Sequence, residues 1–318
     1  MHVFHGYDSV PTGARGAVLA IGNFDGVHRG HRALLETAMD EARRLGCLAG
    51  VIVFEPHPRE FFQPDKPHFR LTPLPRKLAL LEGLGLDLAV VLRFDAVLAG
   101  LAAQEFIARV LVESLRVSHV VIGYDFHFGK GRSGNPETMR QAGHALGFGV
   151  TVVPQVEEAG EAFSSSAIRA ALAQGNVAGA AHMLGHWWRV AGLVVGGAGR
   201  GTGMGFPTAN MKLPRGTMLG HGIYAVRVYV DGVSHAGAAY LGTRPTFDNG
   251  EAVLEVFLLD FEGDLYGRDV EIEFIDFVRA DAKFDSMDAL ATQMAKDVAR
   301  VQEILARAGA NPLSSRPV

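Results

Sequence analysis

The chain has 318 residues, of which 48% are hydrophobic and 20% charged, the composition of a soluble globular protein with room for two domains. Its net charge of −4, without a basic tail, does not favour nucleic acid as a partner, so anionic substrates must be met by local sites. The single cysteine excludes an internal disulfide, and the lack of a signal pattern or of an apolar stretch of about 18 residues predicts a cytoplasmic protein without membrane contact.

The first half of the chain alternates short apolar runs with helical patterns. The runs lack polar alternation, which is typical of strands buried on both faces of a parallel sheet. A helix from about Arg29 to Leu45, with Gly46 as its C-cap, separates the first two runs. Repetition of this order predicts a doubly wound α/β domain, whose last element is a helix from Ser165 to Gly175. The apolar runs are residues 17–21, 48–54, 88–92, 117–123 and 149–154.

The second half has a different pattern, with strands of alternating hydrophobicity and tight turns. Asp231-Gly232 joins two of these strands with a strong two-residue hairpin signal. The absence of helical patterns between the strands predicts a small antiparallel β-barrel, followed by a helix over residues 286–306. The predicted domains are therefore residues 1–185 and 186–318. The alternating segments are residues 188–195, 223–230, 233–241, 253–260 and 270–278.

The motif His28-Arg29-Gly30-His31 follows the first of the apolar runs directly and opens a helix. Ligands of open α/β sheets bind at this kind of junction, where free helix N–H groups favour phosphate. Histidines three residues apart share a helical face, so both can donate to phosphate oxygens, and Gly30 is expected to permit close approach of the ligand. Two histidines alone do not complete a metal site. The spacing therefore favours phosphate binding over metal binding.

Two further segments are expected at the same edge of the sheet. Asp125 follows the fourth predicted strand, and Ser165 stands at a helix start with Arg169 one turn later. Serines at a helix start are most often caps. The arginine adds a charge that a cap does not need and that suits a triphosphate.

A glycine-rich stretch runs from Gly197 to Gly205, with glycine at every second position, and ends in Pro207-Thr208-Ala209-Asn210. Bare backbone lets a phosphate chain approach closely. The Thr208 hydroxyl and the Asn210 amide oxygen are hard ligands of the kind that magnesium on a nucleotide accepts. The glycine spacing matches neither a Walker A loop nor a dinucleotide turn. A plain glycine-rich linker is the alternative.

Glu255 lies within the predicted strand 253–260 and shares a face with Val253 and Phe257. A carboxylate on an apolar face is either a solubilising group of an edge strand or a buried functional group. The local pattern does not choose between the two.

The first-half motifs resemble the nucleotidyltransferase superfamily, with its HxGH and SSTxxR motifs, and in detail the FMN-adenylylating half of bacterial bifunctional riboflavin kinase/FAD synthetases. The resemblance also includes Gly22–His28, Phe54–Pro58 and Gly123–Gly129. It implies that the FMN phosphate attacks ATP directly and releases pyrophosphate, without a covalent intermediate. It further implies that Asp125 lines the flavin site and that ATP is bound by Asn23, His28, His31, Ser165 and Arg169.

The second-half motifs resemble the riboflavin kinase signature GRGxxxGFPTAN. The resemblance implies that Glu255 is the catalytic base, that Gly199 and Gly201 bind ATP, and that Thr208 and Asn210 bind ATP and Mg²⁺. It also assigns Arg279 and Phe284 to the flavin site. The similarity covers about residues 15–305, so the order of the two domains is part of it.

The sequence departs from this family's pattern at Thr202, Tyr240 and Phe257. The resemblance implies a bifunctional enzyme that uses riboflavin, FMN and ATP to make FAD, and it leaves the number of subunits open. Two alternatives remain: an FMN adenylyltransferase with an impaired kinase domain, and a flavin or nucleotide sensor without turnover. Joint retention of a base and phosphate-binding groups argues against the sensor, because binding alone needs no base.

Overall fold

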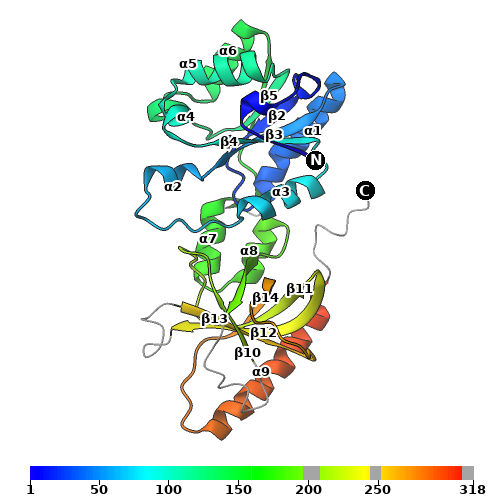
Figure 1. Ribbon diagram of the computed structural model, residues 1–318, viewed down its shortest axis with the longest axis vertical. Coiled ribbons are helices and arrows are strands. Elements are labelled where there is room, and N and C mark those ends of the chain that lie inside the picture. Colours follow the sequence, from blue (N-terminus) through cyan, green and yellow to red (C-terminus); the bar gives the residue numbers. More distant parts are fainter. Residues whose placement is uncertain (159, 196–207, 244–251, 310–318) are drawn as a thin grey trace. The chain divides into compact units, whose positions relative to one another are not determined.

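The computed structural model describes residues 1–158, 160–195, 208–243 and 252–309. The chain divides into two compact units, Met1–Ser164 and Ser165–Val318. Figure 1 shows a layered α/β unit and a unit built on a barrel. Within the described residues, no helix is both long and apolar enough to span a membrane.

The first unit is built on a six-stranded sheet in which all neighbouring strands are parallel. The order is β1-β4-β3-β2-β5-β6, and the five predicted strands are all present. The sequence did not reveal β1, a short strand beside β4 whose residues are mostly exposed and carry no long apolar run. The strands are β1 (His2–His5), β2 (Val18–Ile21), β3 (Ala49–Glu55), β4 (Leu88–Arg93), β5 (His119–Gly123) and β6 (Gly149–Val153).

Helices cover both faces of this sheet. The predicted helix is present as α1 (Arg29–Leu45), ends at Gly46 in the left-handed conformation as expected, and packs across β2, β3 and β5 through Leu35, Ala38 and Ala42. On the other face, a π-helical segment η3 (Phe106–Ser114) contributes to a core with side chains of β2, β3, β4 and β5. The remaining helices are α2 (Pro58–Phe62), α3 (Leu74–Gly83), α4 (Ala96–Gly100), α5 (Ala103–Glu105) and α6 (Pro136–Leu146), with short turns η1 (Tyr7–Ser9), η2 (Thr12–Ala14) and η4 (Lys130–Arg132) and a ribbon β7 (Glu157–Glu158) and β8 (Glu161–Ala162).

The strand order locates the ligand edge of the sheet. The chain runs outward from β2 through β3 to β4, and then returns to the opposite side of β2 for β5 and β6. This reversal makes the carboxyl ends of β2 and β5 the topological switch point, where open α/β sheets bind their ligands. The segments that begin at Gly22 and at Tyr124 both leave the sheet at this point.

The second unit begins with two helices, α7 (Ser165–Ala173) and α8 (Val177–Leu184). The sequence predicted α7 as the last element of the α/β domain, but its contacts place it in this unit, where it packs on α8 and α8 packs on the barrel. The last turn of α7 is tied to the loop before β11, because the Gly220 N–H donates to the Leu172 carbonyl at 2.9 Å. A side chain at Gly175 would meet the Tyr224 hydroxyl at 3.1 Å.

The barrel is closed and antiparallel throughout, in the order β10-β13-β12-β11-β14-β9. Five of its strands match the predicted segments, and Asp231 and Gly232 form the predicted hairpin with positive φ angles of 48° and 81°. The sixth strand, β10, contains residues expected only as ligands. The strands are β9 (Arg189–Val195), β10 (Thr208–Lys212), β11 (Gly222–Val230), β12 (Val233–Thr243), β13 (Ala252–Leu258) and β14 (Asp269–Arg279).

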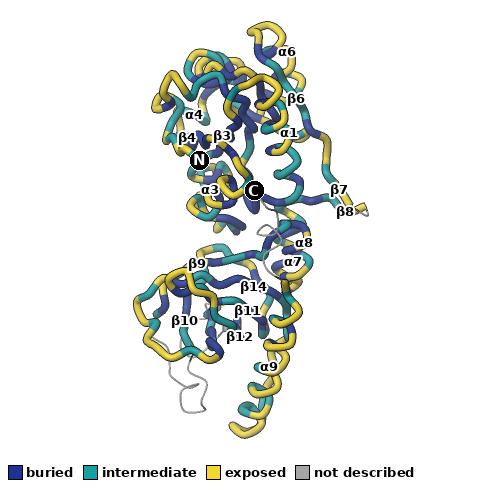
Figure 2. The backbone as a smooth tube through the Cα atoms, turned by 90° about the vertical axis from the view of Figure 1, so that its right-hand side faces the viewer, coloured by how far each residue is buried: buried dark blue, intermediate teal, exposed yellow. Residues whose placement is uncertain are grey.

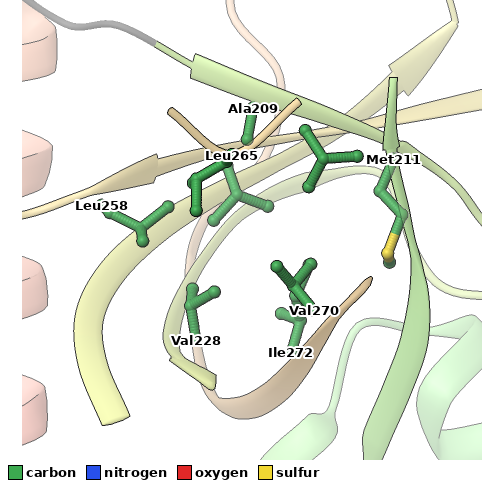
Figure 3. Close-up of a pocket in the computed structure, with 9 residues that line it drawn as sticks. Ala209, Met211, Val228, Leu258, Leu265, Val270 and Ile272 are labelled. Carbon is green, nitrogen blue, oxygen red and sulfur yellow. The ribbon is translucent and has the colours of Figure 1, made fainter. Parts of the chain in front are cut away.

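The barrel interior is a packed apolar core (Figure 3). It encloses a void of about 10 Å³, the space of about one water molecule, and all of its lining side chains are apolar. Ala209 and Met211 of β10 and Val256 and Leu258 of β13 point into it. A void of this size does not hold a ligand as large as a flavin.

The terminal helix α9 (Met287–Arg307) matches the helix predicted over residues 286–306, and it covers part of the outer face of the barrel. It starts at Ser286, whose hydroxyl accepts the Ala289 N–H at 3.1 Å. Val301 and Ile304 pack on Ala225 and Ile275 of the barrel, while the rest of the helix surface is largely exposed (Figure 2).

Candidate functional site

The loop between β2 and α1 has an unusual backbone. Phe24 and Val27 have positive φ angles of 47° and 44°, which bulky and β-branched residues rarely adopt. The Phe24 ring is fully buried, and the Asp25 carboxylate accepts the N–H groups of Leu71 and Thr72, each at 3.0 Å from Oδ1. Burial and hydrogen bonds therefore hold this loop in one conformation at the switch point.

His28 and His31 form a stacked pair at the start of α1. Their ring centroids are 3.5 Å apart with an angle of 20° between the planes. The His28 Nδ1 accepts the His31 backbone N–H at 3.2 Å, so a neutral His28 carries its proton on Nε2. The Phe24 ring lies against His31, with centroids 5.1 Å apart. The structure thus brings the two predicted histidines together and orients a donor on His28.

Gly30 lies among closely packed protein groups. A Cβ at this position would lie 3.0 Å from the Phe163 carbonyl oxygen and 3.1 Å from the His28 ring. The glycine therefore permits close packing of protein groups around the histidine pair. The close approach is that of His28 and Phe163.

The environment of His31 favours its neutral form. Burial is the main cause that brings the pKa of His31 well below its ordinary value, and the charges of His28 and Lys77 add to it. The buried Nδ1 of His31 has no hydrogen-bond partner among the described residues. A buried ring nitrogen without a partner is uncommon in folded proteins and is typical of sites completed by a ligand.

Lys77, which the sequence motifs did not single out, is buried against the loop between β2 and α1. It lies on α3, is 4% exposed, and its Nζ donates to the Asn23 carbonyl oxygen at 2.7 Å. Burial lowers its pKa, and Asp25 and Glu55 oppose that effect. A signal was present in the sequence, because Lys77 occupies an apolar-face position together with Leu74, Leu78 and Leu81.

Asn23 and Asp125 are exposed residues that follow β2 and β5 respectively. Both stand at the carboxyl ends of neighbouring strands, as the sequence predicted. The Asp125 backbone carbonyl accepts a hydrogen bond from the His127 Nδ1 at 2.8 Å. Ser165 is the first residue of α7 in the second unit, and Arg169 lies one turn further along the same helix.

The register of the barrel brings the predicted kinase residues together on its outer face. Asn210 of β10 is directly opposite Glu255 of β13, and Thr208 is opposite Phe257. Direct partners share a face with Cβ atoms about 5 Å apart. Because Ala209 and Val256 point inward, Thr208, Asn210 and Glu255 point outward.

The position of Glu255 excludes one of the two interpretations that its strand pattern left open. β13 is paired on one side with β10 and on the other with β12, so it is an interior strand of a closed barrel. Glu255 is half-buried, and Asn210 beside it is 4% exposed. A solubilising role at a sheet edge is therefore excluded.

Tyr240 continues the same row of residues. It is opposite Glu255 on β12, and on its other side Ile223 of β11 is opposite both Tyr240 and Arg279. The row thus runs from Asn210 to Arg279 across five of the six strands and follows the curved wall of the closed barrel.

Arg279 is fixed by α9. Its guanidinium makes a two-pronged ion pair with the buried Asp297, with Nη2–Oδ2 at 2.8 Å and Nε–Oδ1 at 2.9 Å. It also lies 5.6 Å from the centre of the Phe284 ring, so the two residues assigned to the flavin site are neighbours. The Tyr240 hydroxyl donates to Asp281 at 3.2 Å and ties the middle of the row to the segment that carries Phe284.

Phe257 packs in a cluster formed by α9 and the outer face of the barrel, with Ala238 and Val298. Gly199, Gly201 and Thr202 lie outside the described residues. Among the residues that are described, no cluster of three His, Cys, Asp or Glu side chains suited to a metal occurs. Thr208 and Asn210, two residues apart on β10, carry oxygen donors of the kind that a magnesium ion sharing its ligands with nucleotide phosphates accepts.

Comparison with known proteins gives matches along both units. A family model described as FAD synthetase matches residues 10–167, and one described as riboflavin kinase matches residues 184–305. A relative from Escherichia coli (strain K12), named bifunctional riboflavin kinase/FMN adenylyltransferase, is 44% identical over 91% of this chain and 92% of its own length. One from Pseudomonas fluorescens with the same name is 41% identical over 96% of this chain and 98% of its own.

A solved structure from Streptococcus pneumoniae, described as a macrolide-efflux protein, superposes with a TM-score of 0.85. It is 30% identical to this chain and covers 95% of it, with 99% of that protein matched. The fold of both units is therefore found in a solved structure.

Proposed function

The chain belongs to the bifunctional riboflavin kinase/FMN adenylyltransferase family, and we propose that the residues described above perform its two reactions at two separate sites. The barrel unit phosphorylates riboflavin with ATP to give FMN. The α/β unit transfers an adenylyl group from ATP to FMN and releases pyrophosphate. The observation that carries the proposal for the kinase site is the direct opposition of Asn210 and Glu255 on the outer face of the barrel.

In the kinase reaction, Glu255 accepts the proton of the ribityl hydroxyl as the hydroxyl oxygen bonds to the γ-phosphorus and ADP leaves. Thr208 and Asn210 hold the phosphates and Mg²⁺ beside the carboxylate, and Gly199 and Gly201 bind ATP. The metal supplies charge neutralisation at the transferred phosphoryl group. Arg279 and Phe284 bind the flavin, at the other end of the row from Asn210.

In the adenylyl transfer, the FMN phosphate forms a bond to the α-phosphorus of ATP and the bond to pyrophosphate breaks. His28 donates from Nε2 to phosphate oxygen, in agreement with its Nδ1 acting as an acceptor toward the protein. His31 and Asn23 are the other ATP ligands of the first unit in this proposal, and the family resemblance adds Ser165 and Arg169. Asp125 binds the flavin. Positioning and charge stabilisation suffice, because the incoming phosphate is itself the nucleophile.

Neither alternative interpretation is favoured. An impaired kinase would be expected to lack part of the Asn210–Glu255 arrangement, yet both residues are present and in register. A sensor without turnover needs neither a catalytic base nor two separate groups of site residues. The substrates are small molecules found in the cytoplasm, and we propose that location for the protein.

The proposal is tested by incubating the purified protein with riboflavin, ATP and MgCl₂ and separating the flavins by chromatography. FAD as the end product, with FMN formed first, is the expected result. Accumulation of FMN alone would contradict the adenylyl-transfer assignment, and unchanged riboflavin would contradict the kinase assignment. Omission of MgCl₂ with a chelator present should stop FMN formation.

A further inference from the structure

Lys77 is a buried cation whose only hydrogen bond among the described residues is to a neutral group. It is 4% exposed, and its Nζ donates to the Asn23 carbonyl oxygen at 2.7 Å. The described residues give this ammonium no carboxylate at ion-pair distance, although Asp25, Glu55 and Glu60 attract it from further away and Arg70 repels it. Burial of a charge without an ion-pair partner costs free energy, so the presence of a lysine here suggests a specific role.

The bond from Lys77 acts on the loop that forms the phosphate end of the site. Asn23 is followed by Phe24 and then by Gly26 and Val27, all three with positive φ angles. This conformation costs free energy at Phe24 and Val27, so contacts with the surrounding residues must stabilise it. The Lys77 bond restrains the loop at its start, and the bonds of Asp25 to Leu71 and Thr72 restrain its middle.

The loop in turn positions the histidine pair. Phe24 packs against His31, which stacks on His28 at a centroid distance of 3.5 Å. We propose that Lys77 is a positioning residue for adenylyl transfer, which acts through the Asn23–Val27 loop to hold His28 and His31 in their reactive arrangement. This inference rests on the proposed adenylyl transfer in the first unit.

The charge of Lys77 also reaches His31. Burial is the largest cause of the low pKa of His31, and His28 on its own helix and Lys77 on α3 lower it further. Lys77 therefore has two separable effects, a hydrogen bond to the loop and a charge that disfavours the imidazolium form of His31. A residue that only filled space in α3 would have neither.

The test uses the full chain with Lys77→Met, which removes both effects at similar volume, and Lys77→Gln, which keeps an N–H donor and removes the charge. Arg43→Met is the matched control, because it removes an exposed cation from the same unit, where the Arg43 side chain is 78% exposed. For each protein, kcat and KM are measured for FAD formation from FMN and ATP. Riboflavin phosphorylation by the same sample reports the fraction of competent chains.

We expect Lys77→Met to lower kcat for FAD formation by roughly 10- to 100-fold with a much smaller change in KM, the effect of misplaced reacting groups. Lys77→Gln should lose less, and the Arg43→Met control should match the wild type. Riboflavin phosphorylation should be unchanged in all three. In both Lys77 variants, the ring resonance of His31, assigned with His31→Gln, should titrate at a higher pKa than in the wild type.

A kcat within twofold of the wild type in folded Lys77→Met would overturn the proposal, and so would an unchanged pKa of His31. Should Lys77→Met fail to fold, Lys77→Gln decides by the same two measurements. Failure of the wild type to form FAD from FMN would instead contradict the proposed function itself, so the two failures are distinguishable.

Discussion

Asn210 on β10 and Glu255 on β13 are directly opposite each other on two neighbouring, hydrogen-bonded strands of the barrel. This pairing places an amide oxygen beside a carboxylate on an interior strand pair of a closed sheet. In the proposed kinase site, the metal ligand Asn210 and the base Glu255 are thus neighbours without any rearrangement of the strands. The pairing leads to a prediction about each residue.

Replacement of Asn210 with alanine should weaken the binding of Mg²⁺ and ATP phosphates in the kinase site. We expect riboflavin phosphorylation to fall by roughly 10- to 100-fold at low Mg²⁺, with partial recovery as the metal concentration rises, because only one of its oxygen ligands is removed. Initial rates measured across a Mg²⁺ titration check this. An unchanged half-saturation concentration would show that Asn210 does not bind the metal, and FAD formation from FMN serves as the internal control.

Replacement of both His28 and His31 with alanine should have the opposite selectivity. We expect FAD formation from FMN to fall roughly 100-fold or more, since donors aimed at developing phosphate charge are lost. Riboflavin phosphorylation should continue and FMN should accumulate, because the kinase residues are in the other unit. The accumulation of FMN is measured by chromatography. Equal losses of both activities would contradict the separate assignment of the two sites.

The stability of the first unit should depend on pH through His31. In the unfolded chain this ring takes up a proton near pH 6.5, whereas in the folded chain its pKa lies well below that value. Between the two pKa values the unfolded state binds more protons, so the free energy of unfolding falls as the pH drops below about 6.5. His119, whose pKa burial also lowers, acts in the same direction.

Calorimetric unfolding at pH 7.5 and pH 5.5 separates these contributions. The wild type should lose more stability over this interval than His31→Gln, in which only the His119 contribution remains. Identical losses in the two proteins would show that His31 is not buried in its neutral form.

Phe257 should matter for stability more than for chemistry. Its ring packs with residues of α9 and the barrel, so Phe257→Ala should lower the free energy of unfolding by about 1–3 kcal/mol, less than the ~3–5 kcal/mol for a fully buried phenylalanine. Met287→Ala is the matched control, because Met287 is 60% exposed on the same helix and should change stability by less than about 0.5 kcal/mol. Urea unfolding measures both. A neutral Phe257→Ala would contradict the packing described for α9.

Much of the fold follows from local patterns. The runs of β2–β6 are apolar on both faces and are unambiguous, and Gly46 and Asp231-Gly232 mark a helix end and a hairpin by conformations that few other residues adopt. β1 lacks such a run, because its residues are mostly exposed. β10 was read as a ligand segment, since its alternation is short and follows a glycine-rich stretch. The helix α7 was placed with the α/β unit on chain order alone, whereas long-range contacts decide its partner.

The site residues could be predicted from the sequence only where their arrangement depends on local structure. The His28–His31 spacing is a local property of a helix, so its geometry could be foreseen. The opposition of Asn210 and Glu255 depends on the register between strands far apart in sequence, which only the family resemblance suggested. Lys77 reaches its site from 54 residues beyond Asn23, and no local pattern places its ammonium at the Asn23 carbonyl.

The central claim is that one chain holds two independent sites, with Glu255 as the base of only one of them. Glu255→Gln keeps the size of the side chain and removes its ability to accept a proton. Glu303→Gln, an exposed residue of α9 whose side chain is 56% accessible, is the matched control and should behave as the wild type.

The most direct measurement is chromatography of the flavins formed by Glu255→Gln from riboflavin and, separately, from FMN, each with Mg-ATP. We expect a loss of roughly 100-fold or more in FMN formation from riboflavin, together with FAD formation from FMN at the wild-type rate. Riboflavin phosphorylation at the wild-type rate in Glu255→Gln would contradict the assignment of Glu255 as the base.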